Sequence, residues 1–357
     1  MVRDAWPGSC RVGAQARFAV SHGESLASLL EQSLRAHANS CAFVCMGREL
    51  SYAELDARSR HLAGWLQSHG LERGARVAVM LPNLLQYPVA LVAILRAGYT
   101  AVNIDPRCTA CELEHRLIDS GAQVIVLLDA CLPALRAMQP NKVVRHAVVT
   151  SVGEMLGVRG PAHAGESPGM TCTGFGAAIA LGAEAGFRPV RLAADDIAVL
   201  QYTDGAAGVS MSTALRHRDL IVNLLQWQAW CEPVYRLRAG IEQRVTVAAL
   251  PLYHPFGLTV CGLLTMRCGG LGILIPDARD VPGIVKTLRG YKIHSFPGDE
   301  TLYEALLNEP EFARLDFSEL ADAGVEGAVL PPAIAIRWEA VTGVPIASRD
   351  GALLLVS

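Results

Sequence analysis

The chain has 357 residues, of which 51% are hydrophobic and 18% are charged, and its formal net charge is −3. This charged share lies below the roughly 25% of an average soluble domain, which argues against disorder and for a large buried core. No basic stripe indicates a nucleic-acid partner, and the first residues lack the apolar run of a secretory signal.

The N-terminal half alternates between helix and strand patterns. After an N-terminal extension over 1–20, amphipathic helices are predicted over 24–38 and 51–69, the second with Ser51 as N-cap and Glu54 completing a capping box. Three apolar strands follow, "RVAVMLP", "YTAVNID" and "AQVIVLLD", separated by the helical segments "NLLQYPVALVAILRAG" and "ACELEHRLIDSG". The alternation predicts an α/β fold with largely parallel sheets covered by helices.

Residues 150–192 interrupt this pattern. They are rich in Gly, Ala, Ser and Thr with little periodicity, so an irregular excursion is predicted there. Regular patterns resume with the strand "DIAVLQ" and continue in a second alternating block to about residue 349. Within it, the apolar stretch 257–276 is interrupted by Arg267 and several glycines, which favours a buried helix and strand over a membrane span.

The ten cysteines are scattered along the chain. Cys108 and Cys111 form a CxxC pair with His115 nearby. A structural zinc site needs a second pair of ligands at matching spacing, and none stands out. We therefore predict no metal site and expect free thiols, as in a cytoplasmic protein.

The stretch 202–213, "YTDGAAGVSMST", lies between a strand pattern and the helical pattern "ALRHRDLIVNLLQWQAW". Gly205 and Gly208 supply backbone freedom, and Thr203 and Ser210 supply hydroxyl donors, so the segment is suited to hold a phosphate at a helix N-terminus. It does not match the Walker A pattern GxxxxGK[ST]. From the residues alone, a nucleotide site and an ordinary strand-to-helix turn both remain open.

Longer blocks carry a more specific signal. "LSYAELDARSRHLAGWLQ", "GARVAVMLPNLLQYPVALVAILRAGYTAVNIDP", "DDIAVLQYTDGAAGVSMSTALRHRDLIVNLLQ" and "LPLYHPFGLTVCGLLTMRCGG" follow one another in that order. The chain thereby resembles, over residues 21–349, the N-terminal domain of the adenylate-forming enzymes, and most of all the long-chain-fatty-acid–CoA ligases. The resemblance implies that fold and an ATP- and magnesium-dependent activation of a fatty acid to acyl-AMP, followed by transfer to coenzyme A. It also implies a C-terminal lid domain, which we expect to be missing here.

The resemblance assigns roles to individual positions. It places an acyl-pocket residue at His254, and a nucleotide-binding loop at Tyr202, Thr203, Gly205, Gly208 and Ser210. The family's loop usually reads YTGGTTGVSKGA. Ala206 and Ala207 replace two threonines and so remove two hydroxyls, Met211 replaces a lysine and removes a cation, and Asp204 replaces a glycine and adds an anion. Because a charge-assisted hydrogen bond contributes roughly 1.5–3 kcal/mol, we expect weakened ATP binding. Arg216 and Arg218 lie a helical turn or two later; they either compensate in part or are simply solvated helix positions.

Two later positions also depart from the family pattern. Val325 and Glu326 stand where glycines usually let the backbone approach the ligand, so their side chains are expected to crowd it. The tail 350–357 diverges from the family's YGLTE, and Leu354 occupies the place of the magnesium-binding glutamate. No residue is therefore assigned as catalytic or as a metal ligand.

Together these features predict a fatty acid–CoA ligase-like protein whose adenylation is lost or strongly impaired, located in the cytoplasm or peripherally at the inner membrane face. Two alternatives remain open. One is a non-catalytic acyl-binding or interaction module, acting as a homo-oligomer or paired with an intact homologue. The other is the truncated product of a decaying gene. The expected small-molecule partner is a fatty acid.

Overall fold

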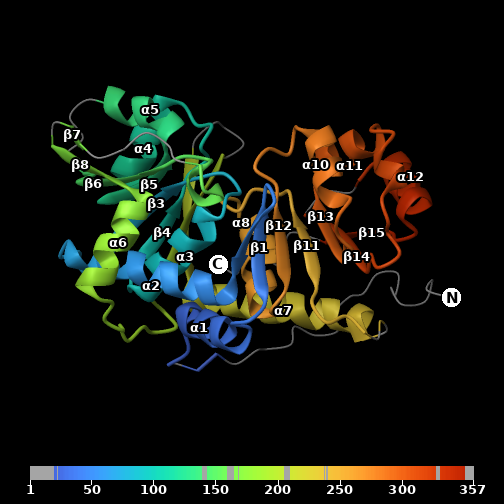
Figure 1. The fold of residues 1–357 in the computed structure, drawn as a ribbon, viewed down its shortest axis with the longest axis horizontal. Coiled ribbons are helices and arrows are strands. Elements are labelled where there is room, and N and C mark those ends of the chain that lie inside the picture. The colour runs from blue at the N-terminus through green and yellow to red at the C-terminus, as the bar shows by residue number, and fades with distance from the viewer. Residues whose placement is uncertain are drawn as a thin grey trace.

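Two helix-covered sheets lie side by side in the computed structural model of the chain (Figure 1). The structure describes residues 20–21, 23–138, 143–158, 165–167, 169–204, 210–236, 238, 240–326 and 330–349. The predicted N-terminal extension, apart from its last residue, and the divergent tail lie outside these ranges. The α/β class and the largely parallel sheets predicted from the sequence are confirmed.

The first sheet has eight strands. In sheet order they are β10 (Ser210–Arg216), β9 (Ile197–Asp204), β4 (Thr100–Asn103), β3 (Arg76–Met80), β5 (Val124–Leu128), β6 (His146–Thr150), β8 (Met170–Gly174) and β7 (Gly165–Ser167). The inner strands pair in parallel, whereas β10 and β7 add antiparallel edges. Strands such as β5 are buried on both faces, which explains their continuous apolar sequences.

Helices cover both faces of this sheet. They are α1 (Leu26–Ala36), α2 (Tyr52–Ser68), α3 (Gln86–Arg96), α4 (Ala110–Ser120), α5 (Leu132–Ala137) and α6 (Phe175–Ala185). Apolar residues of α4 and α5 share one core with the sheet, and those of α2, α3 and α6 share the other. The predicted capping box of α2 is confirmed, because Ser51 Oγ accepts from the Glu54 amide at 3.1 Å and the Glu54 carboxylate accepts from the Ser51 amide at 3.3 Å.

The prediction that residues 150–192 are irregular is wrong, since this segment contributes β7, β8, α6 and a short 3-10 turn (Glu154–Leu156). The reason lies in how closely α6 approaches α2. A Cβ atom on Gly182 would lie 1.9 Å from the His61 carbonyl oxygen, and one on Gly64 would lie 2.6 Å from the Gly182 carbonyl oxygen. A helix with such a contact face is built from small residues, so it shows no clear hydrophobic period.

The second sheet has seven strands. In sheet order they are β15 (Ile346–Arg349), β14 (Asp322–Glu326), β13 (Ser295–Gly298), β11 (Val245–Ala248), β12 (Leu271–Leu274), β1 (Cys41–Cys45) and β2 (Arg48–Ser51). All neighbouring strands pair in parallel except the β1–β2 hairpin. One face packs on α10 (Val281–Leu288), α11 (Glu300–Leu307) and α12 (Pro332–Thr342) around the fully buried Trp338.

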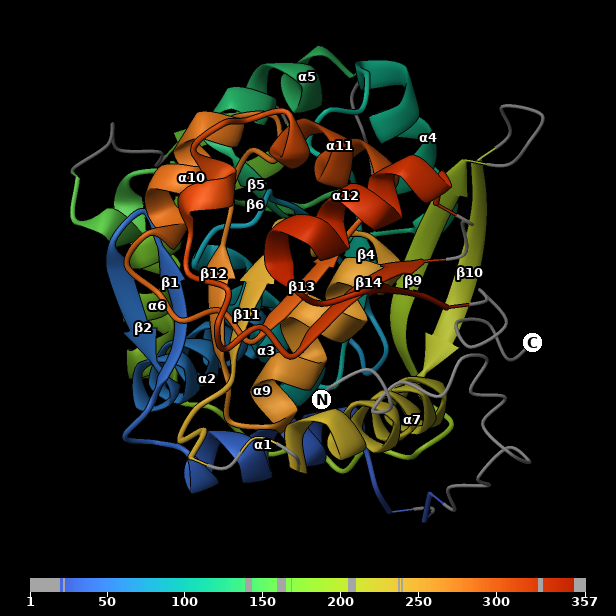
Figure 2. The same ribbon diagram turned by 90° about the vertical axis from the view of Figure 1, so that its right-hand side faces the viewer.

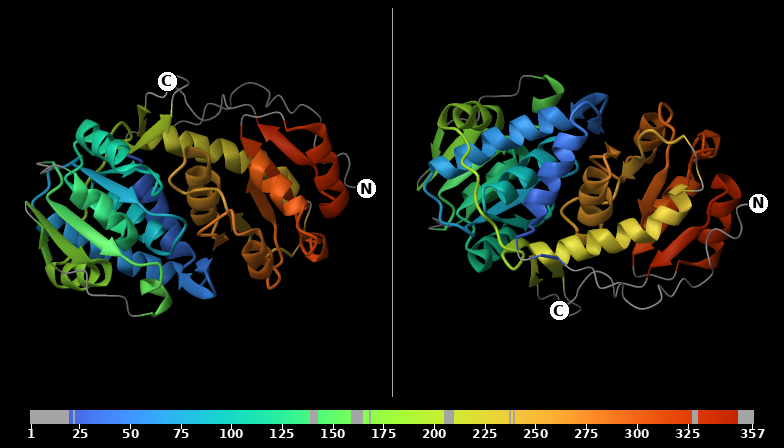
Figure 3. Two further views of the ribbon diagram at one scale, coloured as in Figure 1. Left: turned by 90° about the horizontal axis from the view of Figure 1, so that it is seen from above. Right: turned by 90° about the horizontal axis from the view of Figure 1, so that it is seen from below.

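A helical segment from residue 255 to residue 267 and the long helix α7 (His217–Arg236) lie on the other face. The segment comprises α8 (Pro255–Gly257), a π-helical stretch (Leu258–Leu263) and α9 (Leu264–Arg267), and it leads into β12. The predicted buried helix followed by a strand is therefore confirmed. Helix α7 runs beneath both sheets and links them (Figure 3). Within the described ranges, every helix is too short or too polar to cross a bilayer.

Candidate functional site

The carboxyl ends of β3 and β11, one strand from each sheet, meet at Asn83. Its side-chain amide donates to the carbonyl oxygens of Ala248 and Leu250, both at 2.8 Å, and its Oδ1 accepts from the Leu252 amide at 2.8 Å. Asn83 is buried, so these bonds take the place of hydrogen bonds to water. A single side chain thus fixes the loop after β11 to the first sheet.

A second series of hydrogen bonds reaches the same loop. The buried Tyr87 hydroxyl lies 2.7 Å from the Leu252 carbonyl oxygen and 2.8 Å from Asn103 Oδ1. Asn103 Nδ2 donates to Gln201 Oε1 at 3.2 Å, and Gln201 Nε2 donates to the Tyr253 carbonyl oxygen at 2.7 Å. Strands β4 and β9 and helix α3 therefore all hold the residues that precede His254.

His254 stands where this loop becomes a helix. Its backbone is extended, Pro255 begins α8, and the His254 carbonyl accepts from the Leu258 amide at 2.8 Å. Desolvation lowers the pKa of the imidazole, against the opposing effect of the Asp299 carboxylate. The residue is nevertheless exposed at the surface, and the lowered pKa keeps its imidazole neutral at pH 7.

An ion pair borders the same loop. Arg107 donates to both Asp105 oxygens, at 3.2 and 3.0 Å, and to the Tyr253 hydroxyl at 3.1 Å. Although burial opposes the shift, these contacts lower the pKa of Asp105. The Arg107 side chain is exposed, so the pair contributes little to stability.

The structure separates Tyr202 from this network. The Tyr202 hydroxyl donates to Asp119 Oδ2 at 2.6 Å, and its ring packs under the Arg116 guanidinium on α4. Neighbouring residues of a strand point to opposite faces, so Gln201 and not Tyr202 faces the loop that carries His254. Sequence reasoning missed Gln201, Asn103 and Asn83. Their signal was a polar side chain at or shortly after the end of an apolar run in the sequence.

The predicted strand–turn–helix setting of the phosphate-type loop is wrong. Strand β9 continues through Thr203 to Asp204, and Ser210 begins β10, which pairs back on β9 in antiparallel register. Figure 2 shows this hairpin at one side of the molecule, with α7 following below it. Gly205 and Gly208 lie outside the described residues. The strand β10 therefore stands between this stretch and the N-terminus of α7 in the chain.

Of the two possibilities left open for Arg216 and Arg218, partial compensation is not supported, because β10 lies between the loop and both residues. Arg216 pairs with Ile197, at the end of the hairpin opposite to Ser210, which places it roughly 20 Å away at about 3.3 Å per residue. Both guanidiniums instead contact Asp195, at 3.6 and 2.7 Å. The cation that Met211 replaces therefore has no substitute from these two arginines.

The crowding expected from Val325 is also wrong. This side chain is buried among the apolar residues under α10, α11 and α12. Gly324, its neighbour on β14, faces the opposite side and lines a cavity. The Glu326 side chain and Leu354 lie outside the described part of the chain.

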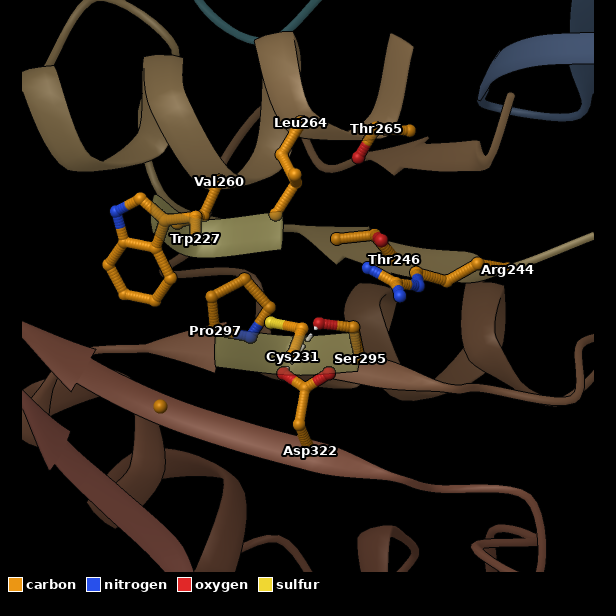
Figure 4. Close-up of a pocket in the computed structure, with 11 residues that line it drawn as sticks. Trp227, Cys231, Arg244, Thr246, Val260, Leu264, Thr265, Ser295, Pro297 and Asp322 are labelled. Carbon is orange, nitrogen blue, oxygen red and sulfur yellow. Dashed lines mark hydrogen bonds between the residues drawn. The ribbon is translucent and has the colours of Figure 1, made fainter. Parts of the chain in front are cut away.

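That cavity lies between α7, the segment 255–267 and the second sheet (Figure 4), and its volume is about 20 Å³. Its lining residues are Trp227, Cys231, Arg244, Thr246, Val260, Leu264, Thr265, Ser295, Pro297, Asp322 and Gly324. The apolar lining comes mainly from the helices, whereas most of the polar groups come from the starts of β11, β13 and β14. A space of this size accepts about one water-sized group.

The CxxC pair forms no metal site with other described residues. Cys111 is an exposed thiol on α4, and Cys108 is a free thiol in the loop before it. Burial raises the pKa of Cys108 to about 11, so this thiol stays protonated and unreactive. Within the described ranges, no three His, Cys, Asp or Glu side chains come together as a metal-binding group.

The fold and this site define a class of protein. They comprise two helix-covered, largely parallel sheets that are joined at the carboxyl ends of β3 and β11, and a histidine at the start of a helical segment that lines a cavity. A model of the AMP-binding enzyme family matches residues 30–348. The chain belongs to the AMP-binding enzyme family.

Curated relatives and solved structures agree with this assignment. A long-chain-fatty-acid–CoA ligase of Escherichia coli O6:H1 is 39% identical over 337 residues, which cover 90% of this chain and 58% of the relative. The ligase of the same name from Haemophilus influenzae is 35% identical, with 95% and 62% covered. This chain thus spans about three fifths of the length of these relatives.

Among solved structures, the anthranilate CoA ligase AuaEII in complex with anthranoyl-AMP superposes with a TM-score of 0.77 at 22% identity, covering 92% of this chain and 60% of that one. ATP-bound MatB from Rhodopseudomonas palustris gives a TM-score of 0.71 at 24% identity, with 92% and 60% covered. These likenesses show the shared fold.

Proposed function

We propose that this chain binds a carboxylic acid for a fatty acid–CoA ligase-type reaction, and that by itself it adenylates that acid weakly or not at all. One observation carries the acid-binding half of the proposal. Residues from both sheets, above all Asn83, Tyr87 and Gln201, hold the loop that ends in His254, and the helical segment after His254 lines a small cavity.

This arrangement supports a simple division of the site. The acid's carboxyl group would lie beside the neutral imidazole of His254, whose uncharged ring does not lock the carboxylate into a strong ion pair. The acyl part would follow the helical segment toward the cavity, where Val260 and Leu264 offer apolar contacts. The buried hydrogen bonds around Asn83 hold these parts in place before the acid arrives, which lowers the entropy cost of binding.

The sequence of the hairpin loop supports weak adenylation. The family's reaction uses ATP with magnesium, and its loop offers hydroxyls and a lysine to the phosphates. Asp204 and Met211 replace a glycine and that lysine here, and the arginines after the loop are committed to Asp195 at the far end of β10. No three His, Cys, Asp or Glu side chains of the described residues form a metal-binding group, so we assign no metal ligand and no metal-dependent step to them.

The non-catalytic alternative is the same acid site without any adenylation, in which the chain acts as an acyl-binding module. The structure favours neither oligomers nor a pairing with an intact homologue. A residual adenylation rate is what separates a slow ligase from a binding module.

The experiment combines ligand stabilisation with turnover. Purified chain is melted with a panel of carboxylic acids and, separately, with ATP and magnesium, and is then assayed with acid, ATP and coenzyme A. We expect an acid to raise Tm by several degrees at saturating concentration, ATP to change it little, and no acyl-CoA to form. Repeated acyl-CoA turnover would refute the impairment, and absence of stabilisation by every acid would refute the acid site.

A further inference from the structure

The far end of the cavity is polar where an alkyl chain would require an apolar surface. Resting on the proposed acid-binding function, we infer that this site selects an acid whose far end carries an oxygen acceptor, such as an ω-hydroxy acid, over an unsubstituted alkyl acid of equal length. This selectivity would depend on the residues that line the cavity, and not on whether the chain uses ATP.

The geometry of the helical segment leads from His254 to the cavity. Val260, Leu264 and Thr265 line it, six, ten and eleven residues beyond His254. At about 1.5 Å per residue, they lie roughly 9–16 Å along the helix from the position proposed for the carboxyl group. An acid of medium length that followed the segment would therefore bring its last carbons, and not its middle, to the polar end.

Arg244 supplies the main donor there. Its guanidinium points into the cavity (Figure 4) and stacks on the Tyr235 ring, 3.4 Å from the ring centroid. A guanidinium has five N–H donors, and no described residue accepts a hydrogen bond from this one. The stacked ring fixes the orientation of the group but leaves its donors directed at whatever fills the cavity.

The charge of Arg244 is balanced by a carboxylate whose own hydrogen bonds are already made. Asp322 is buried, and its two oxygens accept from the Tyr235 hydroxyl at 2.5 Å and from Ser295 Oγ at 2.9 Å. With one cation and one anion beside it, the cavity does not require a charged ligand. Since no residue in the described part of the chain accepts a hydrogen bond from Arg244, a neutral hydroxyl or carbonyl oxygen of the ligand would take that place.

Two threonines also favour a ligand with an oxygen atom at this end. Thr246 and Thr265 line the cavity and are only 3% and 2% exposed. Thr265 Oγ1 has no hydrogen-bond partner among the described residues. A buried hydroxyl without a partner is costly, so a ligand oxygen between Thr265 and Arg244 would satisfy groups on both sides of the cavity.

An alkyl end at the same place has the opposite effect. It would cover the Arg244 guanidinium and the Thr265 hydroxyl and return no hydrogen bond, so these polar groups would be buried without compensation. Sites built to bond a substrate hydroxyl reject the analogue that lacks it for this reason. A hydrogen bond to a charged group is worth about tenfold to a hundredfold in affinity, so we expect the ω-hydroxy acid to bind at least tenfold more tightly.

The test is calorimetric titration without nucleotide, using decanoate and 10-hydroxydecanoate as matched probes. In the unaltered chain the hydroxy acid should bind at least tenfold more tightly than decanoate. Arg244→Leu should abolish or reverse that ratio. Thr265→Val changes little in shape and removes only the unpaired hydroxyl, so it should keep the fold and reduce the ratio severalfold. Arg236→Leu, an exposed arginine on α7 outside the cavity lining, is the matched control and should leave the ratio unchanged.

Each outcome decides the inference. Equal or tighter binding of decanoate by the unaltered chain overturns it while leaving the proposed acid site intact. An unchanged ratio in both Arg244→Leu and Thr265→Val overturns it as well, because the selectivity would then arise elsewhere. Binding of neither probe overturns it, and the melts with the wider acid panel then show whether the proposed function fails with it.

Discussion

His217 connects the start of α7 to α1 through a buried contact. Its Nδ1 accepts from the Leu26 amide at 3.1 Å, which requires that nitrogen to be unprotonated. The ring is 1% exposed, and burial lowers its pKa to about 4 from a usual value of 6.5. The imidazole is therefore neutral in the folded chain at pH 7.

This predicts a loss of stability in acid. The unfolded chain binds a proton below pH 6.5 and the folded chain does not, so the contribution of His217 is present above pH 6.5 and is lost as the pH falls toward 4. At about 1.4 kcal/mol per pH unit, the total is on the order of 3 kcal/mol. Urea unfolding of the unaltered chain and of His217→Gln across this range measures it. Parallel pH profiles would show that His217 does not carry the effect.

Asn83 is the residue on which the candidate site depends most for its shape. Replacing it with alanine removes three buried hydrogen bonds and leaves their backbone partners unsatisfied. We expect a loss of about 2–4 kcal/mol in the free energy of unfolding, together with weaker acid binding. Asn223→Ala is the control, because Asn223 is also buried but its Oδ1 has no partner in the described part of the chain. Equal losses in the two variants would contradict the role given to Asn83.

The hairpin loop gives a test by restoration. A variant with Asp204→Gly, Ala206→Thr, Ala207→Thr and Met211→Lys regains the family's hydroxyls and cation and loses the added anion. We expect ATP to bind at least about tenfold more tightly, since each charge-assisted bond is worth that much or more. Titration calorimetry with ATP and magnesium measures the change. Arg216→Ala and Arg218→Ala should leave ATP affinity unaltered, and a large loss in either would show that these arginines do serve the loop.

At the scale of elements, the contact between α2 and α6 is limited by glycines. Gly182→Ala would place a methyl group 1.9 Å from the His61 carbonyl oxygen, so the helices must separate. We expect a destabilisation of about 1–3 kcal/mol, the usual cost of overpacking. Gly174→Ala, at the N-cap of the same helix with nothing within 4 Å, should change stability much less. Thermal melts compare the two, and a neutral Gly182→Ala would contradict the close approach.

The hairpin β9–β10 also changes how the loop can work. A loop directly at a helix N-terminus draws on the helix dipole. Here the strand β10 follows the loop in the chain before α7 begins, so the setting differs from the one expected from the sequence.

Across the whole molecule, the sequence predicted the regular core well and the site only in part. Apolar runs such as Val124–Leu128 and the capping box at Ser51 depend on local chemistry, so their elements were predicted correctly. The small residues of α6 and the strand Ser210–Arg216 were not, because their structure depends on partners distant in sequence. The same holds for Arg244 and Asp322, which lie 78 positions apart and line one cavity.

Pyrophosphate exchange into ATP, measured on the purified chain with and without acid, tests most directly whether this molecule binds acids without activating them. We predict that an acid which stabilises the chain produces no exchange above the rate without acid, and that exchange rises in the loop-restored variant only if the rest of the site is intact. Acid-dependent exchange by the unaltered chain, sustained over many turnovers, would contradict the proposal and show that the altered loop still adenylates.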